Sequence, residues 1–438
     1  KDIYHYNKIE DPSKKKNKIY KLLDQYNDNP LVHLLYAKYL IKNSDNKLFE
    51  QLNIYNNINK KWLKNNEFSN LKLSFISSGI FAGALGNHYN PFLYINAKKA
   101  NLVEDNQLIC LMGDYNYSNL FFANYFKPYV NFITNSKIIE EFKYLEKNLI
   151  LPLGFCTPFK NSCNLMNYSN NNILNELEKI NKDPIYFKLS DEDFSKGLNN
   201  LKKFNLTKKD WYVTLHVREV GWRGETLKNS KDIHRTADPL DYIPAIEEIT
   251  KLGGYVIRVG DLSMKKLPKL KNVIDYAHHP EKTKFMDVFF GATSKFCIGT
   301  SSGYCIIPMS FGVPLFLTNM LPTEAIFSLD KKDMYLPKIL IKNNKKLDFN
   351  EYFNPEMQFL CQDQDYYKKN ISWKNNTSLE LKKSVREFID LTLNKKSNIK
   401  SNNQKKIDNI INTNLNKFGI RNRTSLPNFF LGEYEDLL

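Results

Sequence analysis

The chain has 438 residues, which is more than one ordinary hydrophobic core accommodates, so we expect two or three domains. Its formal net charge of +16 favours acidic partners such as phosphorylated small molecules, anionic membrane surfaces or nucleic acid. The lysines are scattered and no zinc finger, basic zipper or RNA-recognition motif is present, so we expect no specific nucleic-acid partner.

Cysteine use and apolar runs indicate the expected compartment. The six cysteines form no CxxC pair, and several lie in apolar runs such as LICLMG, which favours free buried thiols and a reducing environment. No apolar run reaches the roughly 18 residues of a transmembrane helix, and no secretory signal is recognisable. We therefore expect a cytoplasmic protein, either free or peripheral on the anionic inner face of a membrane. The first residue is Lys rather than Met, as in a chain whose N-terminal segment has been trimmed.

Residues 1–70 are expected to form a helical N-terminal segment. Asn29 and Pro30 suit the N-cap and first turn of a helix, and leucines follow them at helical spacing. The stretch 29–52 resembles one unit of a helical-hairpin repeat, which cannot bury its own apolar face. We expect this segment to pack on the next domain or to continue a repeat region.

Residues 71–207 are expected to form a first Rossmann-like domain. The runs LKLSFISSG and QLICLMG suit strands, and between them a Gly-containing loop precedes a helix that we place from Pro91, with Asn90 as N-cap. The stretch NLFFANYFKPYVNFI is expected to be helical, and a further helix is expected from about residue 190. Strands that alternate with helices predict a parallel α/β sheet.

Residues 208–395 are expected to form a second Rossmann-like domain with at least five strands. WYVTLHV, GYVIRVGD, VIDYA, KFCIGT and VPLFLTN suit strands, whereas DYIPAIEEITKLGG and KFMDVFFGAT suit helices, the first of them with Asp241 as N-cap. Thr377 and Glu380 form a capping box for a later helix. We expect residues 396–438 to be a tail that packs back on the body, beginning with either a solvated helix or a linker.

The strand WYVTLHV runs directly into charged residues. His216 and Arg218 are two positions apart, so their side chains lie on the same side of an extended strand. Arg218 is placed either to grip a diphosphate bidentately or to form an interdomain salt bridge with Glu219 or Glu225. His216 is either a satisfied core histidine or a ligand contact. Arg223 and Arg235 are weaker candidates in the same loop.

Two further strand ends carry candidate ligand contacts, because ligands of doubly wound sheets bind beyond the carboxyl ends of the strands. The turn Thr300, Ser301, Ser302 and Gly303 resembles a phosphate cradle at the start of a helix, and the alternative is a hydroxyl N-cap. Arg258 and Asp261 end the strand VIRVGD, where Arg258 contacts a ligand or forms a structural ion pair with an aspartate.

The loop after the first strand supplies a fourth group of candidates. Gly86, Asn87 and His88 would face the same cleft, and His88 is either a catalytic base or a histidine without a catalytic role. The pair His278-His279 lacks a second ligand cluster, so we expect no metal site. There is no GxGxxG, no Walker P-loop and no GxSxG motif.

The LHVRE strand, the RVGD strand end and the IGTSSG turn resemble the fucosyltransferase-like branch of the GT-B glycosyltransferases, which includes α1,2/α1,6- and protein O-fucosyltransferases. With the GNH loop near 86–88 and the DYA strand, the pattern is closer still to a glycosyltransferase family of bacterial polysaccharide loci. The resemblance covers roughly residues 71–330. It implies two Rossmann-like domains that face a cleft, and metal-independent sugar transfer without a cofactor.

The resemblance also implies roles for individual residues. Arg218 would hold the β-phosphate of a nucleoside-diphosphate sugar, His216 would lie near the donor, and the Thr300–Gly303 turn would contact the phosphates. The acceptor hydroxyl, on a glycan or a protein, would enter from the first domain. The family motif is often HxRxxD, whereas this chain has Gly221 at the last position. Either Glu219 or Glu225 takes the place of the aspartate, or the donor is a nucleotide sugar other than GDP-fucose. The alternatives are a nucleotide-sugar epimerase of GT-B shape and a non-catalytic nucleotide-sugar-binding scaffold.

Overall fold

The structure is a computed structural model, which describes most of the backbone and most of its side chains. The described residues are 6, 9, 11–42, 47–65, 73–76, 78–103, 107–113, 117–140, 170–221, 224, 226, 228–321, 330–360, 362–394, 400–415 and 421–438. Within these ranges, no helix combines the length and the apolar character that are needed to cross a membrane.

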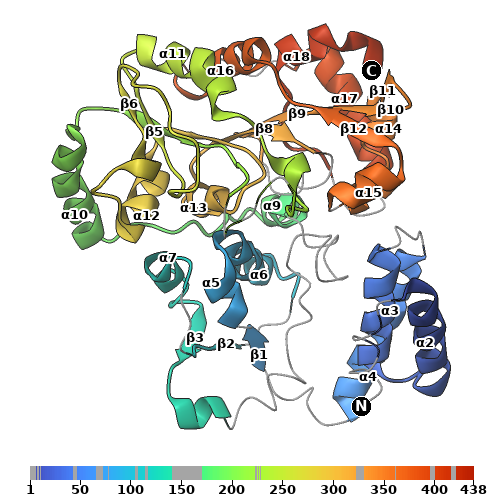
Figure 1. The fold of residues 1–438 in the computed structure, drawn as a ribbon. Helices are drawn as coiled ribbons and strands as arrows, with labels where there is room; N and C mark the ends of the chain where they lie inside the picture. Colours follow the sequence, from blue (N-terminus) through green and yellow to red (C-terminus); the bar gives the residue numbers. More distant parts are fainter. Residues whose placement is uncertain are drawn as a thin grey trace.

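The helices α2 (Pro12–Gln25), α3 (Pro30–Lys42) and α4 (Leu48–Asn65) precede the first strand (Figure 1). Asn29 caps α3, because its Oδ1 accepts a hydrogen bond from the amide of Leu31 at 3.0 Å. Helices α3 and α4 pack against each other, and Gln51 Nε2 lies 2.8 Å from His33 Nδ1 across their interface. The stretch 29–52 therefore contributes to a pair of packed helices.

The first sheet is small and parallel, with strand order β1-β2-β3. Its elements are β1 (Leu73–Ile76), α5 (Ser78–Gly83), a 3₁₀ turn (Leu85–His88), α6 (Tyr89–Lys99), β2 (Gln107–Leu111), α7 (Leu120–Asn124) and β3 (Val130–Ile133). Helix α6 continues directly from the 3₁₀ turn, so the prediction of Asn90 as its N-cap is wrong. The run from Asn119 was predicted as one helix. It divides into α7 and β3 at a turn, 125–129, that contains Pro128.

The second sheet has six parallel strands in the order β6-β5-β4-β7-β8-β9. The strands are β4 (Tyr212–His216), β5 (Tyr255–Arg258), β6 (Val273–Ile274), β7 (Cys297–Gly299), β8 (Leu315–Met320) and β9 (Met334–Pro337). Numbered within the sheet, this is the 3-2-1-4-5-6 order of a doubly wound Rossmann sheet, which confirms the predicted Rossmann-like unit. The order reverses between β4 and β7, the strands that carry His216 and the IGTSSG turn.

Helices cover both faces of this sheet. The layer elements are α10 (Asp191–Leu201), α11 (Ile243–Lys251), α12 (Lys284–Thr293), α13 (Ile306–Ser310) and α16 (Ser378–Thr392). Figure 1 shows α11 and α16 on one face, with α12 and α13 on the other. Asp241 is not the cap of the helical stretch before β5. A 3₁₀ turn (Pro239–Tyr242) precedes α11. Asp238 caps this turn by accepting a hydrogen bond from the amide of Leu240 at 2.9 Å.

The C-terminal part forms a third sheet, which is antiparallel, and further helices. These elements are β10 (Ile339–Lys342), β11 (Lys345–Lys346), α14 (Phe349–Tyr352), α15 (Asp363–Lys368), β12 (Ile371–Lys374), α17 (Asn402–Leu415) and α18 (Asn428–Glu433). The predicted capping box of α16 is confirmed, since Glu380 N donates to Thr377 Oγ1 at 3.3 Å and Thr377 N donates to Glu380 Oε2 at 2.6 Å. Helix α17 buries Ile407 and Ile411, so this stretch is neither a linker nor a fully solvated helix.

The C-terminal tail contacts both the second sheet and a helix beside the first. Arg423 Nε donates to Asp330 at 2.8 Å, while Arg423 Nη1 donates to Asn175 at 2.6 Å and to Glu178 at 2.7 Å. Asn175 and Glu178 belong to α9 (Asn170–Lys179), which packs on α6. A single guanidinium thus connects the tail with the helical layer of the first sheet.

Candidate functional site

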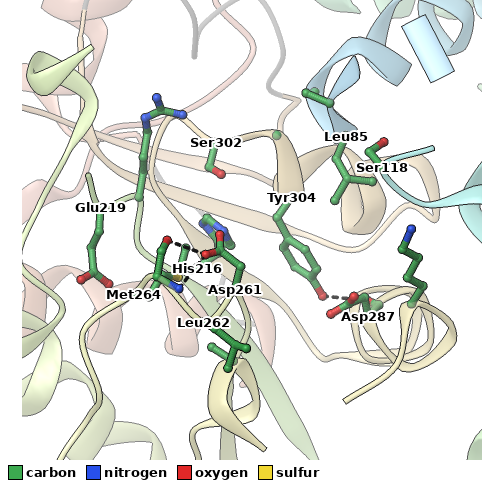
Figure 2. Close-up of a pocket in the computed structure, with 18 of the residues that line it drawn as sticks. Leu85, Ser118, His216, Glu219, Asp261, Leu262, Met264, Asp287, Ser302 and Tyr304 are labelled. Carbon is green, nitrogen blue, oxygen red and sulfur yellow. Dashed lines mark hydrogen bonds between the residues drawn. The ribbon is translucent and has the colours of Figure 1, made fainter. Parts of the chain in front are cut away.

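A cavity of about 1240 Å³ lies where the carboxyl ends of β4, β5 and β7 meet the loops that follow β1 and β2. The first sheet contributes residues 82–87, together with 117 and 118, and the second contributes the segments beyond its strand ends. Figure 2 shows Leu85 and Ser118 on one side of the cavity, Glu219 on the other, and His216 between them. The cavity is therefore at the switch point of the large sheet, where ligands of this topology bind.

His216 ends β4 and its ring lines the cavity. The ring stacks on that of Tyr304, with centroids 5.6 Å apart and an interplanar angle of 9°. Burial, reinforced by the positive charge of Arg258, lowers the pKa of His216 to about 3, so the imidazole is neutral. Its buried Nδ1 has no hydrogen-bond partner within the described part of the chain. Among the described residues, His216 is therefore not a core histidine with all its hydrogen bonds satisfied, and its contact with a ligand stays a prediction.

Arg218 and Arg235 form a pair at the wall of the cavity. Each guanidinium contacts the same oxygen of Asp232, with Arg218 Nη2 at 3.3 Å and Arg235 Nη1 at 3.4 Å from Oδ2. Arg235 also donates to Ser301, from Nε to Oγ at 2.9 Å and from Nη2 to the carbonyl oxygen at 2.9 Å. The backbone of Arg218 donates to Thr300 Oγ1 at 2.8 Å. Both guanidinium groups thus stand side by side on the wall of the cavity, and arginine is the side chain best suited to bind a phosphate or carboxylate.

The turn after β7 divides its predicted roles. Ser302 and Gly303 line the cavity. Thr300 and Ser301 are buried, and their contacts hold Arg218 and Arg235 instead. The structure thus brings all four residues to the site, two of them at its surface and two behind it.

Gly303 also brings the two sheets' loops into backbone contact. A Cβ atom on Gly303 would lie 2.5 Å from the amide nitrogen of Gly86, and a Cβ on Gly86 would lie 3.1 Å from the Cα of Gly303. Real Cβ contacts of 2.5 Å essentially do not occur, so only glycine fits at residue 303 in this arrangement. Gly86 and Asn87 line the cavity next to this contact, as the sequence predicted.

Arg258 does not line the cavity. Its side chain is fully buried and pairs with Glu219 at 2.6 Å and with Asp275 at 3.0 Å, while Nη2 also donates to the carbonyl oxygen of Lys265 at 3.0 Å. The structural ion pair is therefore the better of the two predicted roles. Asp261 does line the cavity, and its Oδ1 accepts from the amide of Ser263 at 2.9 Å.

The backbone explains why Gly221 occupies the position where the HxRxxD motif has an aspartate. Gly221 has a φ of +136°, which residues with a side chain rarely adopt. A Cβ there would also lie 3.0 Å from Oγ of Ser263. An aspartate is therefore strained in this loop, and the carboxylate of Glu219 is engaged by Arg258. Arg223 lies outside the described residues.

His88 lies behind the cavity lining, in an aromatic core. Its ring centroid is 5.2 Å from that of Phe81, 5.0 Å from Phe122 and 5.8 Å from Phe126. Nδ1 is 3.0 Å from the carbonyl oxygen of Leu85, and the buried Nε2 has no partner among the described residues. Burial lowers the pKa of His88 to about 4. These surroundings disfavour the predicted role as a base that faces the cleft.

The structure adds cavity residues that we did not predict. Lys282 and Asp287 form an ion pair at 2.7 Å, and Lys284 Nζ donates to the carbonyl oxygen of Tyr117 at 2.7 Å across the two halves. Burial raises the pKa of Asp287. These three residues form no recognisable motif in the sequence, so only the three-dimensional structure places them at the cavity. His278 Nε2 lies 2.8 Å from a backbone carbonyl oxygen, and no described group of three His, Cys, Asp or Glu residues is placed to hold a metal.

Comparisons with known proteins were made for the sequence and for the fold. No protein-family model matches the sequence, and no curated protein sequence matches it. Among solved structures, the glycosyl transferase family 9 protein from Veillonella parvula DSM 2008 has 12% identity over 60% of this chain and 86% of that chain, with a TM-score of 0.38.

Two structures of one dodecameric iron-containing enzyme, TibC, are also similar. The glycosyltransferase TibC from enterotoxigenic E. coli H10407 has 13% identity over 56% of each chain, with a TM-score of 0.30. The heptosyltransferase TibC in complex with ADP-D-beta-D-heptose has 12% identity over 74% of this chain and 76% of that chain, with a TM-score of 0.36. At these identities and TM-scores, the likeness assigns no family to this chain.

Proposed function

We propose that this chain is a glycosyltransferase of GT-B type, which moves a sugar from a nucleoside diphosphate to a hydroxyl of a glycan or protein acceptor. The observation that carries the proposal is the place of Arg218 and Arg235. They stand together at the switch point of a 3-2-1-4-5-6 sheet, on the wall of a cavity of about 1240 Å³ shared with the first sheet. This volume is above the usual range of about 300–1,000 Å³ for ligand pockets, so it offers room for a donor and an acceptor.

The paired arginines suit the chemistry of a departing diphosphate. Guanidinium groups bind phosphate oxygens bidentately and stay charged at every physiological pH. Because the Arg218 guanidinium contacts Asp232 and the Arg235 guanidinium donates to Ser301, both charges are in place before the reaction. Preorganised positive charge stabilises the negative charge that develops on the leaving group. Neutral His216 supplies a hydrogen bond to the donor beside them.

The acceptor side of the site is the loop after β1. Residues 82–87 and Ser118 line the cavity opposite the strand ends of the large sheet. In this proposal the acceptor hydroxyl approaches from that loop, and the reacting sugar lies next to the contact between Gly86 and Gly303. Asp261 and His216 lie on the donor side.

Nucleotide binding tests the first half of the proposal. We expect GDP, UDP, ADP, CDP or dTDP to bind the wild-type protein in calorimetry, and Arg218→Ala to weaken that binding about 10- to 100-fold, as loss of charged hydrogen bonds does. Arg386→Ala is the matched control, because Arg386 is a half-exposed arginine on α16 outside the cavity lining. Its affinity should equal that of the wild type. Wild-type protein that binds none of the five diphosphates would refute the proposal.

Transfer assays test the second half and identify the donor. Sugar nucleotides of the binding base, with GDP-fucose and ADP-heptose included, are incubated with a panel of acceptor glycans, with and without EDTA. We expect release of the nucleoside diphosphate together with a glycosylated acceptor in both conditions, and loss of both in Arg218→Ala. A product sugar nucleotide with an inverted hydroxyl and no transfer would instead identify an epimerase. Tight nucleotide binding with no turnover would identify a scaffold.

A further inference from the structure

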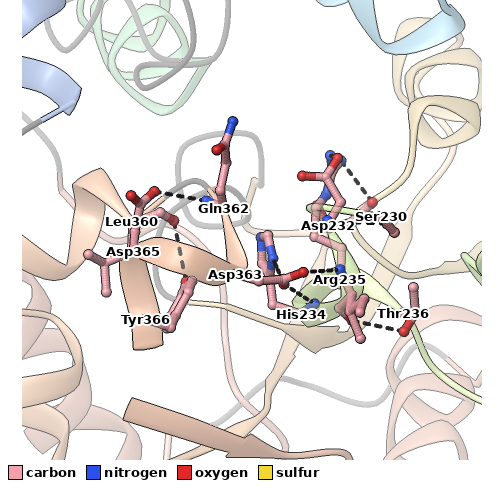
Figure 3. Close-up of polar contacts among 12 residues, drawn as sticks. Ser230, Asp232, His234, Arg235, Thr236, Leu360, Gln362, Asp363, Asp365 and Tyr366 are labelled. Atoms are coloured by element: carbon pink, nitrogen blue, oxygen red, sulfur yellow. Dashed lines mark hydrogen bonds and ion pairs between the residues drawn. The ribbon is translucent and has the colours of Figure 1, made fainter. Parts of the chain in front are cut away.

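The turn that carries Arg235 is held from outside the cavity by one carboxylate of the C-terminal part. This 3₁₀ turn, Ile233–Arg235, lies against the start of α15 (Figure 3). Asp363, the first residue of α15, accepts from the amide of Ile233 at 2.9 Å, from the amide of His234 at 2.8 Å and from His234 Nδ1, 2.6 Å away. The amide of Asp363 donates back to the carbonyl oxygen of Lys231 at 3.0 Å.

Asp363 is only 4% exposed, so these hydrogen bonds are made away from water. Burial by itself raises the pKa of the carboxyl, and the hydrogen bonds from His234 and from the backbone outweigh burial and lower the pKa. A buried carboxylate that accepts several hydrogen bonds fixes the orientation of the groups that donate to it. Here those groups belong to the two residues that directly precede Arg235 in the chain.

The same turn is also held at its side chain and at its far end. The His234 ring packs on Tyr366, with centroids 5.3 Å apart, and on Trp373 at 6.1 Å. The buried amine of Lys338 donates to the carbonyl oxygen of Thr236 at 2.8 Å. The backbone on both sides of Arg235 is therefore fixed by α15 and the adjoining C-terminal strands.

We propose that Asp363 is a positioning residue of the diphosphate site, acting through the 233–234 backbone and His234 to hold the Arg235 guanidinium on Ser301 and beside Arg218. The inference rests on the proposed nucleoside-diphosphate site. Ordering the long side chain of Arg235 around a ligand costs conformational entropy. Because the turn that carries Arg235 is already fixed, part of the entropy cost of ordering this segment is met before the ligand binds. The C-terminal part thereby contributes to donor binding without touching the donor.

Calorimetry with inorganic pyrophosphate, with the five nucleoside diphosphates and with the matching nucleosides tests this role. We expect Asp363→Asn to weaken diphosphate and pyrophosphate binding about tenfold and to leave nucleoside binding unchanged, since only the arginine contact is disturbed. Asp365→Asn is the control, because Asp365 caps the start of the same helix by accepting from the amide of Gln362 at 2.9 Å. It should leave both affinities unchanged.

A double-mutant cycle separates positioning from general support of the fold. In an Arg235→Ala background, Asp363→Asn should change pyrophosphate affinity less than twofold, because the positioned group is already absent. Equal losses in both backgrounds, or equal losses for diphosphate and nucleoside, would overturn the inference. If Asp363→Asn does not fold by circular dichroism, His234→Gln takes its place with an expected loss of about threefold on the same selective readout. An unchanged diphosphate affinity in that variant would also overturn it.

The wild-type measurement distinguishes two kinds of failure. Wild-type protein that binds neither pyrophosphate nor any of the five diphosphates defeats the proposed function, and the role of Asp363 with it. Wild-type protein that binds them while Asp363→Asn binds equally well leaves the proposed function intact and defeats only the role of Asp363.

Discussion

His88 should make the folded protein sensitive to acid. Its ring is fully buried, and burial lowers its pKa to about 4, compared with 6.5 for an ordinary histidine. Between these two values the unfolded chain binds a proton at His88 and the folded chain does not. Stability that is fully present above pH 6.5 is therefore lost as the pH falls towards 4, and the loss from this residue at pH 5 is about 2 kcal/mol.

His88→Phe isolates this effect, because it keeps an aromatic ring among Phe81, Phe122 and Phe126 and removes the titrating group. Urea unfolding of both proteins at pH 7.5 and pH 5.0, followed by far-ultraviolet circular dichroism, gives the free energy of unfolding. We expect the drop between the two pH values to be about 2 kcal/mol smaller in the variant. The buried and acid-sensitive His216 is present in both proteins and cancels in the comparison.

The same variant decides between the two roles of His88. Removal of a general base lowers turnover by about 10²- to 10⁴-fold, whereas replacement of a buried ring outside the lining of the candidate site should leave transfer at pH 7.5 within about threefold. An identical pH dependence of stability in wild type and variant would show that the ring is not buried as described. A hundredfold loss of turnover in a folded variant would restore the catalytic role.

Two other substitutions probe the backbone contact and the buried ion pair. Gly303→Ala places a methyl group against the amide of Gly86, so we expect a stability loss of about 1–3 kcal/mol and reduced transfer. Gly432→Ala is the control, because Gly432 has open space around it, and it should cause neither effect. Wild-type stability and transfer in Gly303→Ala would contradict the contact. Arg258→Met leaves the carboxylate of Glu219 buried without its cation, at a cost of about 3–5 kcal/mol at pH 7.5 in urea unfolding. Burial raises the pKa of Glu219, so protonation should relieve part of that loss at pH 5, and an equal loss at both pH values would show that another group is responsible.

The sequence predicted the large sheet better than the elements around it. Each apolar run predicted as a strand between 211 and 319 contains a strand of that sheet, and helix α12 has the predicted range 284–293. These segments combine strong hydrophobicity with Gly, Pro or Asx residues at their ends, so local pattern and tertiary burial agree. Strands β10 to β12 were not predicted: β10 is apolar but only four residues long, β11 is a pair of lysines, and the three strands are fixed by pairing with one another.

The candidate site shows the same division. The cavity lining includes residues that could be predicted, because strand ends and tight loops can be recognised in a sequence. These residues are Arg218, His216, Asp261, Gly86 and Gly303. Asp363 contacts the Arg235 turn from 129 positions away along the chain, and no local pattern encodes such a pair. For His88 the sequence left open a base that faces the cleft or a histidine without a catalytic role, and only the fold shows that the surrounding phenylalanines bury its ring.

The contact between Gly86 and Gly303 constrains how the two halves can move. The atoms nearest to the Cβ position of each glycine are backbone atoms of the other loop, and backbone atoms cannot rotate away as a flexible side chain can. The two halves also meet where Lys284 Nζ donates to the carbonyl oxygen of Tyr117 at 2.7 Å. A wider opening of the cavity would have to break these contacts. The separation of the walls beside the two glycines is therefore set by backbone atoms and not by adjustable side chains.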